Sequence, residues 1–179
     1  MRFMAVGAVA VAGVVVAASA GATRTMQPGG TIGVYATPGM GAAGKIVITG
    51  AIGDYGTATT IDKSGKVNSN GDYVKIVLKH GGFEVNAVAL NRKANAAPPT
   101  TNSSATCSFS FAVSAPVTLF NGTGLYAGIS GVAHVTETFA GIGPRLTSGP
   151  KKGHCDPSNT APPVAFFASV IGTGTVTFK

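Results

Sequence analysis

The sequence is poor in several residue types on which chemistry and recognition often depend. It has no tryptophan, two cysteines and six acidic residues in 179, and charged residues make up 11% of the chain. It contains no Gly-x-Ser-x-Gly elbow, phosphate-binding loop, dinucleotide fingerprint or His-Glu-x-x-His motif. Beyond residue 22, no run of about 11 residues has convincing helical periodicity. Glycine is abundant, with 26 residues, and short runs of Val, Ile and Thr recur, which is typical of an all-β domain and not of a disordered chain.

The N-terminal 22 residues have the three parts of a secretory signal. One early charge at Arg2 precedes an apolar run over 3–18, and Ala-Ser-Ala at 18–20 supplies small residues for cleavage before Gly21 or a little later. The alternative is a transmembrane anchor, which needs about 20 apolar residues. The run is rich in Ala and Gly and lacks a flanking basic stop, which favours export and cleavage. We therefore expect a secreted or cell-envelope protein without stable membrane insertion once the signal is removed.

The chain that remains after cleavage, about 157 residues, has the usual size of one domain. We expect an N-terminal tether and a short strand over 23–44, followed by a single β domain over 45–179. The sequence does not indicate an oligomeric state.

The two cysteines, Cys107 and Cys155, predict a disulfide, because their number is even and an exported chain meets an oxidising compartment. Such a bond would stabilise the fold by about 4 kcal/mol in the chain-entropy model. The alternative is a metal site that adds the neighbouring His154, but no further Cys or His has a recognisable ligand spacing. We expect no metal and no cofactor.

Basic residues outnumber acidic ones by thirteen to six, which gives a formal net charge of +7. A basic stripe with interleaved aromatic residues would indicate nucleic-acid binding, but the cations are scattered along the sequence. We expect the charge to confer solubility and weak attraction to polyanions, with no nucleic-acid partner.

Apolar and polar residues alternate with a period of two through much of the chain, which predicts strands. The clearest hairpin spans 73–90 and turns at His80-Gly81-Gly82. Two segments are predicted to be loops. The first, 91–105, is low in branched apolar residues and contains Pro98-Pro99, and the second, 140–163, is rich in Gly, Pro, Lys and Ser. The other strand candidates are 31–36, 45–51, 57–61, 107–114 continued by 117–120, 131–139, 164–170 and 173–178.

About eight strand candidates joined by hairpins predict an all-β fold, an antiparallel eight-stranded β-barrel. A β-sandwich is the alternative. Closure into a barrel is favoured because it removes exposed strand edges.

The glycine-dense segment 122–131, GTGLYAGISG, gives the chain a family resemblance. It is similar to the Gly-Thr-Gly, aromatic, Ala-Gly, Gly pattern of dirigent proteins and, more loosely, of the allene oxide cyclase barrel-like superfamily. The resemblance covers about 45–178 and is closest to secreted bacterial members. It implies an eight-stranded barrel with an apolar interior. Dirigent proteins steer the coupling of phenolic radicals and the cyclases close an unsaturated epoxy fatty acid into a ring, both without a cofactor.

Glu137 is the candidate catalytic residue. It has the same strand parity as Val135 and Phe139, so its carboxylate would lie in an apolar interior if that face lines the barrel. Desolvation would then raise its pKa and suit it to act as an acid or to orient a polar ligand. If the opposite face lines the barrel, Glu137 faces water.

Four further residues are candidates for ligand binding. Asp54 and Tyr55 would supply a carboxylate and a phenol at a barrel mouth, although Asp in a turn more often hydrogen-bonds its own backbone. Tyr126 and Phe139 would line an apolar pocket, with core packing as the ordinary alternative.

The sequence thus predicts a secreted, cofactor-free barrel that binds a small apolar or phenolic compound, or that serves a structural or interaction role at the cell envelope. The alternative is an isomerase or cyclase of the dirigent-like or allene oxide cyclase-like type, with Glu137 polarising the substrate. Enzymatic activity is left open.

Overall fold

The structure is a computed structural model that describes residues 28–38, 43–97, 101–158 and 161–179. The predicted signal peptide over 1–22 and the first residues of the predicted tether lie outside the described residues.

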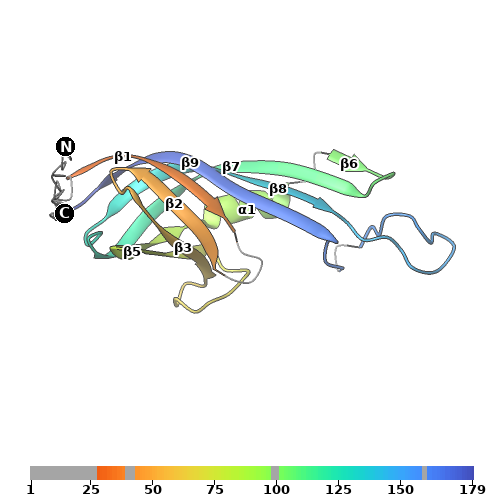
Figure 1. The fold of residues 1–179 in the computed structure, drawn as a ribbon. Coiled ribbons are helices and arrows are strands. Elements are labelled where there is room, and N and C mark those ends of the chain that lie inside the picture. Colours follow the sequence, from red (N-terminus) through yellow and green to blue (C-terminus); the bar gives the residue numbers. More distant parts are fainter. Residues whose placement is uncertain (1–27, 39–42, 98–100, 159–160) are drawn as a thin grey trace, which may run out of the picture.

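Nine strands and one helix make up the described part of the chain, and all strand pairs are antiparallel (Figure 1). The strands are β1 (Gly29–Thr37), β2 (Gly44–Gly50), β3 (Asp54–Ile61), β4 (Tyr73–Leu78), β5 (Gly81–Asn86), β6 (Thr101–Ser103), β7 (Ser108–Gly124), β8 (Ser130–Ile142) and β9 (Ala165–Thr177). The helix is α1 (Val88–Ala96).

The sheet closes on itself. Its order is β5-β4-β3-β2-β1-β9-β8-β7-β6, and β5 also pairs with β7, which makes a ring of eight strands with β6 attached outside the ring. This confirms the eight-stranded antiparallel barrel and excludes the sandwich. β1 pairs with β2 on one side and with β9 on the other, so it is one of the eight strands of the barrel.

Alternate side chains of each strand point into the barrel. On β7 the buried residues are every second one, and the residues between them are exposed, as expected for a strand with one face in the core. The inward residues of β7 are Val113, Ala115, Val117 and Leu119, and those of the neighbouring β8 include Ala133 and Val135. The same parity places Glu137 on the inner face.

Strands β7, β8 and β9 run beyond the barrel and form an extension that we call the arm (Figure 1). The arm comprises 108–112, 138–142 and 165–169, with β6 on its edge. Its inner face is aromatic. Phe139 stacks on Phe111 with 4.7 Å between ring centroids and lies 6.1 Å from the ring of Phe166.

The disulfide between Cys107 and Cys155 is present, which confirms that prediction. It joins the start of β7 to the long connection between β8 and β9. The same connection is held by an isolated bridge between Arg145 and Cys155 and by a hydrogen bond from the amide of Gly143 to the carbonyl of Cys107. The loop predicted over 140–163 is therefore pinned to the arm.

The helix α1 was not predicted. We expected the second strand of the hairpin to reach residue 90 and a loop to follow, but β5 ends at Asn86 and a helix follows. The side chain of Asn86 accepts a hydrogen bond from the amide of Val88, which turns the chain, and the next residues include the good helix formers Ala, Leu, Arg and Lys.

None of the described residues belongs to a helix long and apolar enough to cross a bilayer.

The last strand was predicted in two pieces with a bend, whereas β9 is continuous. A Cβ atom at Gly172 would lie 2.6 Å from Val135, and one at Gly174 would lie 2.8 Å from the Cβ of Ala133. These glycines therefore allow β8 and β9 to pack closely, which explains their spacing without a break in the strand.

Candidate functional site

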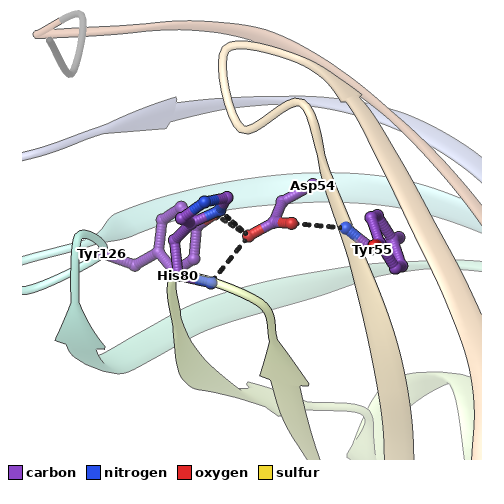
Figure 2. A network of polar contacts seen from close by, with 4 residues as sticks. All are labelled: Asp54, Tyr55, His80 and Tyr126. Atoms are coloured by element: carbon purple, nitrogen blue, oxygen red, sulfur yellow. Dashed lines mark hydrogen bonds and ion pairs between the residues drawn. The ribbon is translucent and has the colours of Figure 1, made fainter. Parts of the chain in front are cut away.

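One end of the barrel is closed by a buried polar cluster built from three different turns (Figure 2). Asp54 begins β3, His80 lies in the turn between β4 and β5, and Tyr126 lies in the turn between β7 and β8. The Asp54 Oδ2 atom accepts a 2.6 Å hydrogen bond from the Tyr126 hydroxyl and one from the His80 amide, and it lies 3.0 Å from His80 Nδ1. The other carboxylate oxygen accepts a bond from the amide of Tyr55. Asp54 thereby joins all three turns.

The carboxyl group of Asp54 is ionised in this cluster. Burial acts to raise its pKa, but the hydrogen bonds from Tyr126, the Tyr55 amide and His80 together outweigh burial and lower the pKa from 3.8 to about 2. A side chain that is 1% exposed thus carries a negative charge held by hydrogen bonds from three residues. This arrangement makes Asp54 a structural anchor for the closed end.

The glycine-dense segment forms the turn that carries Tyr126 into this end. The amide of Tyr126 bonds the carbonyl of Thr123, and the amide of Ile129 bonds that of Tyr126. A Cβ atom at Gly122 would lie 1.7 Å from the Tyr126 carbonyl oxygen, so the turn requires glycine there. The segment is the hairpin turn between β7 and β8, and it closes this end of the barrel.

Above this closed end the barrel encloses a cavity of about 160 Å³. Its wall is almost entirely apolar and is formed by residues from all eight strands of the ring and by Leu90 of α1. Its apolar lining residues include Ile46, Ile48, Ile76, Phe83, Val117 and Val135. Glu137, Asn91 and Thr60 are among its few polar lining residues, and all three also line the hollow outside the cavity.

Glu137 projects from β8 to the boundary between the cavity and the hollow outside it. Burial raises the pKa of its carboxyl group, because the charged form loses contact with water. The face that the sequence left undecided is therefore the inner one. A carboxyl group at the edge of an apolar cavity is suited to hydrogen-bond the polar end of an otherwise apolar ligand.

The hollow outside the cavity, which we call the vestibule, has a volume of about 630 Å³. One side is formed by Phe139, Phe166 and Ala168, which lie at the base of the arm. The other side is mostly polar and comes from α1 and from the loop between β3 and β4. Its polar lining residues are Ser69, Asn70, Asp72, Asn91 and Asn95.

The structure divides the predicted site residues into three groups. Glu137 and Phe139 lie together at the vestibule, and Glu137 also lines the cavity. Asp54 and Tyr126 meet at the closed end. Tyr55 points outward and is 60% exposed, so its ring is separated from the residue next to it in the chain. A ligand role for these residues remains a prediction.

Asn91 is a polar lining residue of both hollows that the sequence analysis did not single out. Its side-chain amide donates to the carbonyl of Gly71 and to the carboxylate of Asp72, which ties α1 to the loop between β3 and β4. The sequence does contain a helical pattern around Asn91. Ala87, Leu90, Asn91 and Ala94 follow the i, i+3, i+4, i+7 spacing of one helical face, over a segment too short for the periodicity to be recognised.

Metal ligands are not gathered anywhere in the part of the chain that the structure describes, since it contains no group of three or more His, Cys, Asp or Glu residues placed to share an ion. Comparisons with family models, with curated proteins and with solved structures find no match to this chain.

Proposed function

We propose that this protein binds a small apolar or phenolic compound inside its barrel. The observation that carries the proposal is the apolar cavity of about 160 Å³, closed at the Asp54 end and bordered at the other by a carboxyl group. Ligand sites are mostly apolar concavities with a few convergent polar groups, and this cavity has that composition.

The volume limits the ligand to about one ring. An engineered apolar cavity of about 150 Å³ in another protein stays dry and binds benzene. A phenol whose ring occupies the cavity would place its hydroxyl near Glu137, and a substituent would extend into the vestibule beside Phe139. A long fatty-acid chain exceeds the cavity and would leave most of its length in the vestibule.

Extraction and mass spectrometry test this proposal on the protein as it is isolated. The expected result is one recurring one-ring compound released from several preparations, with the same compound raising the melting temperature of stripped protein. Repeated preparations that release nothing, together with no thermal shift from any of a panel of phenols, would contradict the proposal.

A second candidate function is an isomerase or cyclase of the kind that the dirigent-like resemblance implies. The burial of Glu137 favours it, because a carboxyl group with a raised pKa is better able to donate a hydrogen bond to a substrate oxygen and polarise it. Glu137→Gln would then retain ligand affinity and lose turnover. Equal turnover in the two proteins would remove Glu137 from any such mechanism.

A further inference from the structure

The outer surface of the barrel carries a row of large apolar side chains that the core does not use. Ile171 on β9 pairs with Tyr35 on β1, Tyr35 with Val47 on β2, and Val47 with Tyr55 on β3. The row therefore crosses four adjacent strands at one level, and we call these four residues the aromatic band. Each of them is about half exposed or more, from 49% for Val47 to 60% for Tyr55.

The ring of Tyr35 lies next to Gly33 of the same strand. A Cβ atom at Gly33 would be 3.3 Å from Cε2 and 3.5 Å from the hydroxyl oxygen of Tyr35, so the ring leans over this glycine. The sheet therefore supports the ring at Gly33, while half of the residue stays exposed to solvent. An exposed aromatic ring that is supported by the sheet can offer a face for stacking.

Cations flank the aromatic band. The amide of Lys79 bonds the carbonyl of Tyr55, which puts this lysine at the end of the row, and Lys45 lies on β2 two residues before Val47. Both lysines are exposed. None of the outward side chains on β1 to β4, all of which the structure describes, is acidic. The uncompensated charge fits an anionic partner.

A shallow hollow of about 650 Å³ adjoins the band next to Tyr35. Gly33 is one of its lining residues, and the polar side chains around it, which we call the rim, supply hydroxyl groups and one imidazole from β1, β2, β8 and β9. The polar lining residues are Thr31, Thr49, Thr173, Thr175 and His134. Such a rim offers hydrogen bonds to a ligand that is itself rich in hydroxyl groups.

We infer that this outer face binds an acidic polysaccharide. Tyr35 and Tyr55 stand two strands apart, about 9 to 10 Å at the spacing of neighbouring strands. Alternate rings of an extended β-linked glycan are separated by a similar length, so two sugars stack on the tyrosines while the sugar between them lies over Val47. Carboxylate or sulfate groups on the glycan pair with Lys45 and Lys79, and its hydroxyls meet the threonine rim.

The same features argue against other occupants. A second copy docked on this face would bring the lysines of both molecules together with no carboxylate on either band to pair with them. A lipid surface offers the hollow mainly phosphate and ester oxygens, which only accept hydrogen bonds, whereas glycan hydroxyls both donate and accept them, as threonine hydroxyls do.

Affinity electrophoresis in two cellulose ethers with the same backbone tests the inference. Carboxymethyl cellulose supplies the acidic glycan and hydroxyethyl cellulose the neutral one. The expected result is retardation by carboxymethyl cellulose, with at least about tenfold weaker retardation by the neutral polymer. Retardation that is equal in the two gels, or missing from both, would overturn the inference.

Matched variants separate this face from general charge attraction. Lys45→Ser with Lys79→Ser is expected to weaken the affinity about tenfold, whereas the same change at Lys151 and Lys152, exposed in the β8–β9 connection, leaves it within about twofold. Tyr35→Ala with Tyr55→Ala is expected to weaken it by a similar factor, and the two Tyr→Phe changes to preserve it. Melting curves establish that each variant is folded.

Three outcomes contradict the assignment. Equal losses from the two lysine pairs would mean that binding follows net charge and not this face. Unchanged affinity of the variant with both Tyr35→Ala and Tyr55→Ala would exclude stacking on these two rings as a source of the affinity. Tighter binding of oligothymidylate or of anionic phospholipid vesicles than of carboxymethyl cellulose would mean that the occupant is a nucleic acid or a membrane. Each outcome leaves the barrel cavity and its ligand untouched.

Discussion

The hydroxyl of Tyr126 donates a 2.6 Å hydrogen bond to the carboxylate of Asp54, which lies 72 residues earlier in the chain. Both side chains are buried, and the bond links the glycine-dense turn to the first residue of β3. The closed end of the barrel therefore depends on a single ionised carboxylate that three turns share.

Removing this hydroxyl is expected to destabilise the fold. Tyr126→Phe keeps the ring contacts with Phe83 and Phe178 but removes one donor from a buried charge. We expect a loss of about 2 kcal/mol in the free energy of unfolding, measured by urea denaturation. Tyr55→Phe is the matched control, because its ring is exposed, and it should change stability by less than about 0.5 kcal/mol. Equal effects of the two changes would contradict the role of Tyr126.

Asp54 should make stability depend on pH in the acid range. Its pKa in the folded protein, about 2, is below the usual value of an unfolded chain, so its contribution is fully present above about pH 4 and is lost as the pH falls toward 2. The contribution is on the order of 2 kcal/mol. The measurement compares the urea midpoints of wild type and Asp54→Asn from pH 2 to 6. The difference should shrink as the pH falls, and a constant difference would contradict the assigned pKa.

Glu137 should make stability depend on pH in the opposite direction to Asp54. Burial raises its folded pKa above that of the unfolded chain, so stability is lost as the pH rises through the folded value. Glu137→Gln carries no charge at any pH, so it should melt at a higher temperature than wild type at pH 8, and this advantage should disappear near pH 4. A variant that melts below wild type at pH 8 would mean that the ionised carboxylate is stabilised by the barrel.

The glycine at 122 should tolerate no side chain. Gly122→Ala places a Cβ atom against the Tyr126 carbonyl oxygen, and we expect a loss of about 2 kcal/mol or more in unfolding free energy. Gly143→Ala is the control, since its Cβ would meet its nearest neighbour, the Cys107 carbonyl oxygen, at 3.5 Å. That variant should unfold within about 0.5 kcal/mol of wild type. A stable Gly122→Ala protein would show that the turn has another arrangement.

The sequence predicted the barrel because alternation survives even where the strands are short. Ile46 and Ile48 on β2 and Ile76 and Leu78 on β4 have the same period of two, and the inner face follows from it once the sheet closes. The pairing of Cys107 with Cys155 followed from their being the only two cysteines.

The polar cluster at the closed end has no comparable local signal. Asp54 and His80 are 26 residues apart, and each lies in a turn where a polar residue is ordinary. Only the barrel register brings them to Tyr126. The face of Glu137 was undecided for the same reason, since a period of two gives two faces and does not say which is inside.

The aromatic band could not be recognised in the sequence, because its members are far apart along the chain. Its four members lie on four different strands, and Tyr35 and Ile171 are separated by most of the sequence although they pair directly. The basic residues appeared scattered and without interleaved aromatics because the interleaving occurs across strands and not along them.

Calorimetric titration with p-cresol is the most direct test of the central claim, that the cavity in the barrel binds a one-ring ligand. The matched pair is Ala58→Leu, which fills the cavity from β3, and Ala112→Leu, which adds the same atoms to the exposed face of β7. Wild type and Ala112→Leu should bind with a dissociation constant of about 1 mM or lower, and Ala58→Leu should give no binding heat. No heat with wild type, or equal heat with all three proteins, would contradict the claim.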